Sequence, residues 1–207
     1  MSKNNGVIFG ISGKLGSGKD TFAEFLAEEL PNRVERHSMA DNLRLITEII
    51  TGVDMCITHE YGKPFINQIR NYTQEQKNIF LPKFNKTIGE TLQLVGTDLL
   101  RERYDNDIWV KSLFSDDLNN KIKEGKIIVV PDVRFLNEAN YIVDNGGVLI
   151  RLEGDPKDIR RNSSRNLNHS SETELDGYNR FHKVIKNDNS LEKLKKKVIE
   201  LITEFNF

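Results

Sequence analysis

The sequence has one cysteine, almost no net charge and no long apolar run, and each of these shortages excludes a class of protein. Cys56 has no second cysteine with which to form an internal disulfide, which is typical of a reducing compartment. No stretch approaches the roughly 18 apolar residues that a membrane-spanning helix needs, and the first residues lack the basic and then apolar pattern of a secretory signal. We therefore expect a cytoplasmic protein that has no membrane partner.

The charge balance also argues against binding to a nucleic-acid polymer. The 31 acidic and 30 basic residues nearly cancel, which leaves a net charge of −1 over 207 residues. A duplex-binding surface needs a clustered excess of lysine and arginine, whereas a small anionic ligand needs only a local basic pocket. The length suits one substantial domain with a core of its own.

The chain is organised around residues 6–21, which read GVIFGISGKLGSGKDT. Apolar, β-prone residues lead into a glycine-rich segment that runs directly into a helix-forming pattern over Thr21–Leu30, as a phosphate-binding loop requires. Glycines let the backbone N–H groups turn toward phosphates, and a lysine and a helix N-terminus add positive charge. The residues predicted to bind the phosphates of a nucleotide are Gly13, Lys14, Gly16, Ser17, Gly18, Lys19, Asp20 and Thr21.

The residue after the loop lysine departs from the usual pattern. Asp20 stands where a serine or threonine hydroxyl usually binds Mg²⁺, and Thr21 follows one place later. Either Thr21 is the metal ligand, or the Asp20 carboxylate meets the metal, directly or through water. The sequence leaves this choice open.

Strand-like and helix-like segments alternate along much of the chain. Amphipathic helical patterns, of which the last covers Leu191–Phe207, separate β-prone runs at Val34–Met39, Lys126–Val130, Val148–Leu152 and Phe181–Ile185. This order predicts a doubly wound α/β fold that has a mostly parallel sheet and crossover helices.

Two segments fall outside this alternation. Residues 54–85 have a weak, polar pattern and a helical pattern follows over about 87–104, so we interpret residues 52–105 as a helical insertion that covers a site. Gly96 inside that helix costs about 1 kcal/mol relative to alanine, which predicts that another group approaches it closely. Residues 155–178 are charged and contain several arginines, as a mobile lid over transferring phosphates would.

The run Lys126–Val130 is the most hydrophobic short segment and is typical of a strand buried on both faces. Pro131-Asp132-Val133-Arg134 follows it. Because ligands bind outside the carboxyl ends of parallel strands, Asp132 and Arg134 are predicted to project into a site. Asp132 would hold Mg²⁺ through water or pair with the loop lysine; the alternative is that it caps the helix that follows.

Four separated parts of the sequence, taken together, resemble the phage and viral deoxynucleoside monophosphate kinase family. They read SGKLGSGKDT, QLVGTDLLRERYDNDIWVK, VVPDVRFLNEA, and NHSSETEL followed by VIKNDNSLEKL, and they leave out residues 52–85. The GKDT ending is shared with that family. The chain departs from its relatives in two places. Relatives often carry arginine a few residues before the Gln-x-x-Gly-Thr string, where this chain has Gly89 and Glu90, and a basic residue can occur at the position of Leu15.

The resemblance implies transfer of the γ-phosphoryl group of ATP to a deoxynucleoside 5′-monophosphate, with Mg²⁺ bound alongside ATP. It also implies the three-layer fold of P-loop kinases as a single domain over residues 1–207, located in the host cytoplasm if the chain is viral. Lys19, Arg134 and Asp132 are the expected catalytic residues. The residues expected on the monophosphate side are Arg44, Arg70, Gly96, Thr97, Trp109, Asp132, Arg134 and Glu138.

Other interpretations stay open at this point. The nearest is a kinase for another small phosphorylated acceptor, such as dephospho-coenzyme A or phosphomevalonate, because such kinases share this loop and sheet. A switch protein that hydrolyses a nucleotide is the second, although such switches usually carry serine or threonine directly after the loop lysine. Arg44 and Arg70 also fit ordinary surface charges, and Trp109 fits an ordinary core residue. A homodimer is compatible with the sequence.

Overall fold

The computed structural model describes residues 6–52, 77–158, 160–161, 169–187 and 190–207 of the chain. Contacts between Cα atoms divide the chain into two compact units. The first comprises Met1–Arg36 and Asp116–Phe207, and the second comprises His37–Ser115. Each unit is described by itself below.

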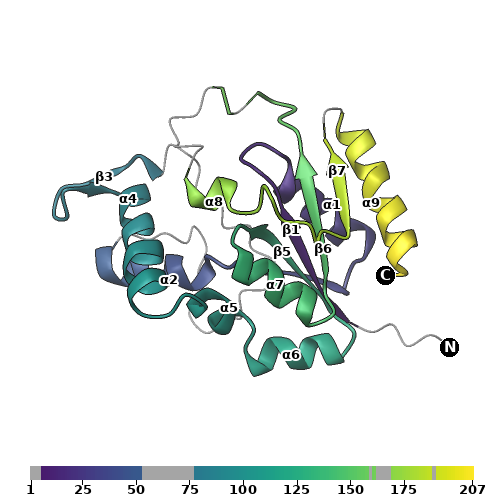
Figure 1. Cartoon of the computed structure of the whole chain (residues 1–207), viewed down its shortest axis with the longest axis horizontal. Helices are drawn as coiled ribbons and strands as arrows, with labels where there is room; N and C mark the ends of the chain where they lie inside the picture. The colour runs from purple at the N-terminus through teal and green to yellow at the C-terminus, as the bar shows by residue number, and fades with distance from the viewer. Residues whose placement is uncertain (1–5, 53–76, 159, 162–168, 188–189) are drawn as a thin grey trace. The chain divides into compact units, whose positions relative to one another are not determined.

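The first unit contains a five-stranded sheet and the helices that cover it (Figure 1). Its elements in chain order are β1 (Val7–Ser12), α1 (Lys19–Glu29), β2 (Val34–Arg36), α6 (Asp116–Lys123), β5 (Ile127–Val133), α7 (Leu136–Asp144), β6 (Val148–Glu153), α8 (Ser170–Thr173), β7 (Lys183–Lys186) and α9 (Leu191–Phe205).

The strands of this sheet follow the order β2-β5-β1-β6-β7, and every neighbouring pair is parallel. Parallel neighbours require crossover connections, which the helices supply. The α/β fold predicted from the alternating sequence pattern is therefore confirmed. Because β1 lies between β5 and β6, its last residue, Ser12, is opposite Val133 and Arg151, so three strands end together at one edge of the sheet.

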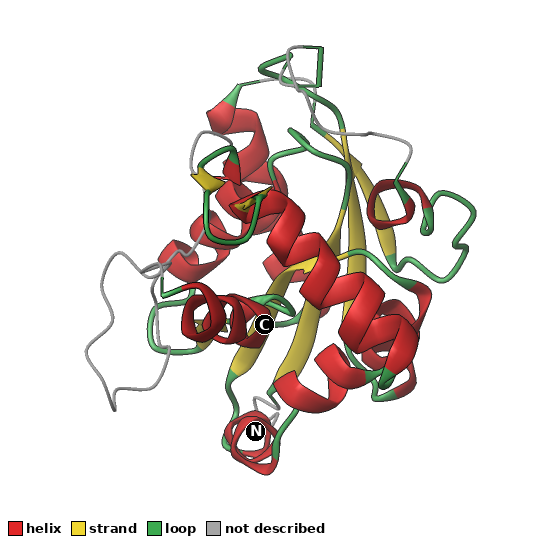
Figure 2. Ribbon diagram, turned by 90° about the vertical axis from the view of Figure 1, so that its left-hand side faces the viewer, coloured by secondary structure: helices red, strands yellow, loops and turns green. Residues whose placement is uncertain are grey.

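Helices cover both faces of the sheet, which makes three layers (Figure 2). On one face, apolar residues of α1 and α9 such as Phe22, Leu26 and Val198 pack with Phe9 and Ile150 of the strands, all at most 1% exposed. On the other face, α7 contacts β1 and β6. The strands that this packing covers on both sides are rich in branched apolar residues, as expected for a buried parallel sheet.

Several strand and helix ends differ from the sequence-based expectation. The second strand ends at Arg36 and not at Met39, because only Val34–Arg36 pair with β5. The last strand is Lys183–Lys186, two residues later than predicted at its start. Helix α6 was missed, since Leu118 is its one buried residue and its apolar pattern is correspondingly weak.

Strand β5 continues through Pro131 and Asp132 to Val133, beyond the predicted end at Val130. Proline has no N–H to donate to a neighbouring strand, so it is tolerated where the pairing is irregular. The register between β1 and β5 shifts at this point, because Gly10 is opposite Val130 and Ser12 is opposite Val133. The irregularity carries the end of β5 past the regular part of the sheet.

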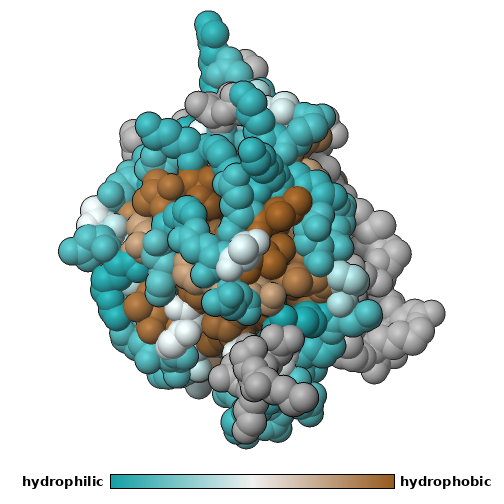
Figure 3. Space-filling view, turned by 90° about the vertical axis from the view of Figure 1, so that its right-hand side faces the viewer, coloured by the Kyte–Doolittle hydropathy of each residue, from teal (hydrophilic) through white to brown (hydrophobic). Residues whose placement is uncertain are grey.

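The surface of the first unit over α9 and β7 has apolar areas separated by polar ones (Figure 3). Val184, Leu191 and Ile199 are each about half exposed there. Among the described helices, none is both long enough and apolar enough to span a bilayer.

The described part of the second unit contains short helices and a hairpin. Its described elements are α2 (Asp41–Thr51), β3 (Phe80–Leu81), β4 (Lys86–Thr87), α4 (Ile88–Gln93), the π-helix η1 (Leu94–Arg101) and α5 (Ile108–Leu113). Thr87 caps α4, because its hydroxyl accepts from the Glu90 N–H and its own N–H donates to the Glu90 carboxylate. The predicted helix over residues 87–104 is thus present, but its central part is a π-helix.

The predicted close approach at Gly96 is confirmed. A Cβ added to Gly96 would lie 2.6 Å from Leu43 Cδ2, and the Trp109 indole Nε1–H donates to the Gly96 carbonyl at 3.0 Å. Both partners belong to the second unit, so Gly96 lets α2, η1 and α5 pack tightly within it.

Candidate functional site

The glycine-rich loop joins β1 to α1, as the sequence predicts. Gly13 and Gly18 have φ angles of 152° and 89°, which side-chain-bearing residues rarely adopt. A Cβ on Gly13 would lie 2.5 Å from both the Leu152 carbonyl and Ser17 Oγ, and a Cβ on Gly18 would lie 2.5 Å from Asn187 Nδ2. Both glycines are therefore required by conformation and by space.

Asn187, directly after β7, fixes the loop from outside. Its side-chain amide donates to the Ser17 carbonyl at 3.0 Å, and the residue is 4% exposed. Sequence reasoning gave Asn187 no role beyond its place in the string VIKNDNSLEKL. The contact holds the loop backbone against the end of the last strand of the sheet, which lies 170 residues away in sequence.

Helix α1 begins at Lys19 with its first N–H groups directed to the loop. Gly18 precedes it without a side-chain cap, and the first backbone bond of the helix runs from the Phe22 N–H to the Gly18 carbonyl at 2.9 Å. The N–H groups of a first helical turn have no partner inside the helix, and the helix dipole makes this end positive. The arrangement suits an anion such as phosphate.

Lys19 is the central charged residue of the site. It is only 8% exposed, and its ammonium donates to the carbonyls of Gly13 at 2.7 Å and Lys14 at 3.0 Å. Burial, followed by the positive charge of Arg134, lowers the pKa of Lys19 from 10.5 to about 7, although the carboxylates of Glu172, Asp20 and Asp132 act in the opposite direction. A phosphate group near Lys19 would restore its charge.

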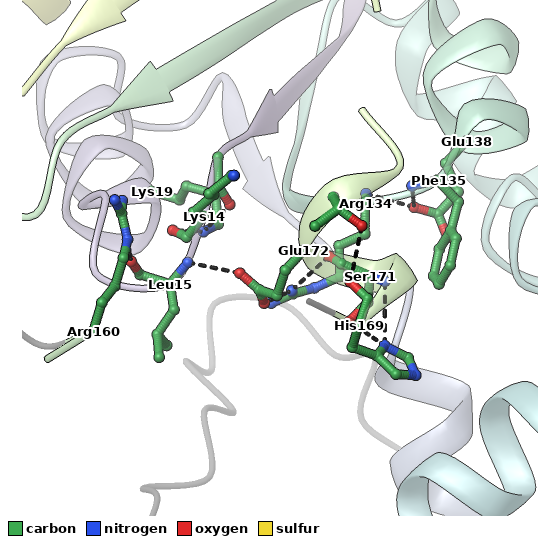
Figure 4. Close-up of polar contacts among 12 residues, drawn as sticks. Lys14, Leu15, Lys19, Arg134, Phe135, Glu138, Arg160, His169, Ser171 and Glu172 are labelled. Atoms are coloured by element: carbon green, nitrogen blue, oxygen red, sulfur yellow. Dashed lines mark hydrogen bonds and ion pairs between the residues drawn. The ribbon is translucent and has the colours of Figure 1, made fainter. Parts of the chain in front are cut away.

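Arg134 follows β5 and reaches the same loop through a glutamate (Figure 4). Its guanidinium donates to Glu172 Oε1 at 2.6 Å and to the Ser171 carbonyl at 3.2 Å, while Glu172 Oε2 accepts from the Leu15 N–H at 2.9 Å. The Glu172 side chain is 1% exposed. Sequence reasoning placed Glu172 in the lid and gave it no role; the string NHSSETEL was the available signal.

Asp132 and Glu138 flank Arg134 in different ways. Asp132 lies inside β5, so it is not the cap of α7 that was considered as its alternative role. Glu138 is 2% exposed, and its carboxylate accepts from the N–H groups of Arg134 at 2.8 Å and Phe135 at 3.2 Å. Glu138 therefore fixes the backbone from which the Arg134 side chain extends.

Asp20 and Thr21, the two candidate metal ligands, lie in the first turn of α1. The Asp20 carboxylate forms an ion pair with Arg36, the last residue of β2. This pairing was not anticipated from the sequence. It occupies one Asp20 oxygen with a cation that the protein itself supplies.

Further cations surround the loop. Lys14 at 2.8 Å and Arg151 at 2.5 Å both donate to the Asp176 carboxylate. Burial alone would raise the pKa of Asp176, but these hydrogen bonds outweigh burial and lower that pKa. Arg160 Nε donates to the Leu15 carbonyl at 2.7 Å. Arg160 is the one arginine of the predicted lid whose contact reaches the loop among the residues that the structure describes, while Arg165 lies outside them.

Mg²⁺ fits the residues at this loop. Mg²⁺ bound with nucleotides is typically held by one or two protein oxygens, substrate phosphates and water. Thr21 and Asp20 offer such oxygens, and Ser17 Oγ is buried with no hydrogen-bond partner in the described structure. The described residues contain no group of three or more His, Cys, Asp or Glu side chains that would hold a metal alone.

The other residues predicted for the acceptor belong to the second unit. Arg44 donates to Asp41 Oδ1 at 3.0 Å and to Ser38 Oγ at 3.4 Å. Trp109 is 6% exposed and uses its N–H for the Gly96 carbonyl, so it is a core residue of this unit. Thr97 lies in η1, and Arg70 lies outside the described residues.

Comparisons with known proteins match the chain along most of its length. The family model described as "Deoxynucleotide monophosphate kinase" matches residues 38–198. A protein of Acanthamoeba polyphaga mimivirus named as a deoxynucleotide monophosphate kinase is 32% identical over 207 residues, covering 95% of this chain and 96% of the relative. The deoxynucleotide monophosphate kinase of Enterobacteria phage T4 is 29% identical over 168 residues, covering 73% of this chain and 65% of that protein.

Solved structures were also matched. A dephospho-CoA kinase from Campylobacter jejuni has a TM-score of 0.47 and 18% identity, covering 96% of both chains. A shikimate kinase from Bacteroides thetaiotaomicron has a TM-score of 0.48 and 14% identity, covering 97% of this chain and 99% of the other.

Raising the pH from about 7 to about 10 is expected to stabilise the wild-type protein relative to Lys19→Met. The unfolded chain, whose lysine pKa is near 10.5, keeps its proton through this window, whereas the folded protein releases it above about 7, so the stability rises with pH. The gain is at most about 1.4 kcal/mol per pH unit. Urea unfolding at each pH measures it, and parallel curves for the two proteins would contradict the lowered pKa.

Proposed function

Because the chain belongs to the deoxynucleotide monophosphate kinase family, we propose that it transfers the γ-phosphoryl group of ATP to a deoxynucleoside 5′-monophosphate, giving the diphosphate and ADP. The observation that carries the proposal is the loop with its buried Lys19, whose ammonium donates to two backbone carbonyls of the loop and whose pKa is lowered to about 7. A bound phosphate would stabilise the charged form of this buried ammonium.

The reaction asks the protein to hold two anionic molecules in line and to neutralise charge. An oxygen of the acceptor phosphate attacks the γ-phosphorus, the bond to the oxygen that bridges to the β-phosphate breaks, and ADP keeps that electron pair. Little covalent work is left to the protein, so positioning and electrostatic stabilisation account for catalysis. The loop N–H groups and the α1 N-terminus supply fixed positive ends for the phosphates of ATP.

Three side chains are assigned to the transfer itself. Lys19 supplies a mobile cation for the terminal phosphates, and Arg134 supplies a planar guanidinium that can bind two phosphate oxygens at once. Asp132, beside them at the end of β5, is assigned to orient the acceptor or a cation. Glu138 supports Arg134 by binding its backbone N–H, which is a positioning role.

We assign Thr21 as the protein ligand of Mg²⁺ and Asp20 to a structural role. The ion pair with Arg36 gives the Asp20 carboxylate a partner already, whereas the Thr21 hydroxyl offers a neutral oxygen of the kind this loop usually presents to the metal. Held by Thr21, Mg²⁺ would supply positive charge against the phosphates of the nucleotide.

Residues of the second unit are assigned to the acceptor. The support is the family match, which runs across both units from residue 38 to residue 198. Within that span, Arg44 and Arg70 are assigned to the monophosphate, and Gly96, Thr97 and Trp109 to the shape of the acceptor-binding unit. The chain thus acts as one kinase domain, with residues 52–105 as the insertion and 155–178 as the lid.

Incubation with MgATP and a panel of acceptors tests this function. We expect ADP to form with deoxynucleoside monophosphates, and we expect Lys19→Ala to lower that turnover by about a thousandfold or more, since one preorganised charge contact commonly contributes that much. Lys195→Ala is the matched control, because this lysine pairs with Glu28 on the surface. Turnover with dephospho-coenzyme A or phosphomevalonate alone, or hydrolysis that needs no acceptor, would overturn the proposal.

The metal assignment makes a separate prediction. Thr21→Ala is expected to raise the Mg²⁺ concentration at half-maximal activity by about tenfold, as losing one oxygen ligand or its orienting partner typically does. Asp20→Asn removes the ion pair with Arg36, so it is expected to lower the melting temperature. It is expected to leave the Mg²⁺ concentration at half-maximal activity close to that of wild type. Titration of MgCl₂ at fixed ATP measures the Mg²⁺ requirement of both variants, with Thr21→Ser as the control, and thermal unfolding measures their melting temperatures. The reverse pattern would make Asp20 the ligand.

A further inference from the structure

Glu172 binds two hydrogen-bond donors that a nucleotide phosphate would also use. One is the N–H of Leu15 in the glycine-rich loop, at 2.9 Å from Oε2, and the other is the guanidinium of Arg134, at 2.6 Å from Oε1. Figure 4 shows the carboxylate lying between the loop and Arg134. The two oxygens of one carboxylate thus connect the loop backbone to the arginine.

A terminal phosphoryl group would make the same kind of contact. Loop N–H groups and a nearby arginine are the usual donors to its oxygens, and a carboxylate also offers anionic oxygens at a similar spacing. Glu172 is also close enough to Lys19 for its charge to oppose the lowering of the Lys19 pKa. The glutamate therefore faces both cations that phosphoryl transfer requires.

The rest of this segment is anchored in a similar way. Glu174, just after α8, accepts from the Leu136 N–H at 2.9 Å, and Asp176 accepts from Lys14 and Arg151. Three carboxylates within residues 172–176 thus bind N–H groups or cations at this edge of the sheet. Of the three, Glu172 is the one whose contacts include a loop N–H and Arg134 together, and its side chain is 1% exposed.

We propose that Glu172 occupies the place of the terminal phosphate in the free protein, so that a triphosphate must displace it in order to bind with all its contacts. The inference rests on the proposed function, because it takes ATP to be the ligand of the loop. Displacement frees the Leu15 N–H and the Arg134 guanidinium together. These two donors then bind phosphate oxygens of the substrate in place of the Glu172 carboxylate.

The consequence is a lower apparent affinity for ATP than the loop alone would give. When the binding-competent state is only a fraction of the free protein, the apparent Kd is the intrinsic Kd divided by that fraction. Glu172 thus tunes ATP affinity without touching the bound nucleotide.

The test is calorimetric titration of the full chain with Mg²⁺ and the β,γ-imido analogue of ATP, with no acceptor present. Glu172→Gln keeps the shape of the side chain but removes its charge, and charge-assisted hydrogen bonds are about twice as strong as neutral ones. We expect this variant to bind the analogue about fivefold more tightly than wild type. Glu174→Gln, the matched control, is expected to change the Kd by less than about twofold, since the Glu174 carboxylate accepts from the Leu136 N–H, which lies outside the glycine-rich loop.

Unchanged or weaker binding by Glu172→Gln, or equal tightening by Glu174→Gln, would overturn the inference. If wild type does not bind the analogue at all, the proposed function fails instead, so the two failures are distinguishable.

Should Glu172→Gln not fold, hydrogen exchange of the wild-type protein tests the displacement. With the analogue bound, peptides covering residues 170–176 are expected to exchange faster while those covering the loop exchange more slowly, and slower or unchanged exchange at 170–176 would refute displacement.

Discussion

The structure depends on keeping a lysine ammonium buried beside the loop that binds phosphate. Lys19 is 8% exposed and is held by two carbonyl groups of its own loop, so its charge is poorly compensated in the free protein. Burial and the nearby Arg134 lower its pKa to about 7. Burial of the Lys19 ammonium therefore costs free energy on folding. An anion bound beside it would stabilise the charged form, so the same burial favours anion binding.

The surrounding fold serves to hold that lysine and its loop in place. Three parallel strands end together at the loop, and the residue after β7, Asn187, binds the Ser17 carbonyl from the side. The shifted register at the end of β5 carries the chain to Arg134, and Glu138 then fixes the backbone N–H of that residue. Glu172 holds the Arg134 guanidinium and the Leu15 N–H until a substrate replaces it.

Sequence reasoning found the parts of the site that have local signatures. The loop is recognisable because glycine spacing, a preceding strand and a following helix all lie within residues 6–30, and Arg134 was placed by the buried strand before it. The contacts of Glu172 and the Asp20–Arg36 pair could not be found in this way, since each contact joins residues that only the tertiary fold brings together. The π-helix was also missed, because its apolar pattern resembles that of an α-helix over so few residues.

The most direct test of the account is the number of protons taken up when MgATP binds without an acceptor at pH 8. Calorimetry in two buffers of different ionisation enthalpy gives that number. Since the pKa of Lys19 is about 7 in the free protein and bound phosphates raise it, we predict an uptake that approaches one proton per site in wild type and is absent in Lys19→Met. Tight binding with no proton uptake would contradict the central role given to the buried lysine.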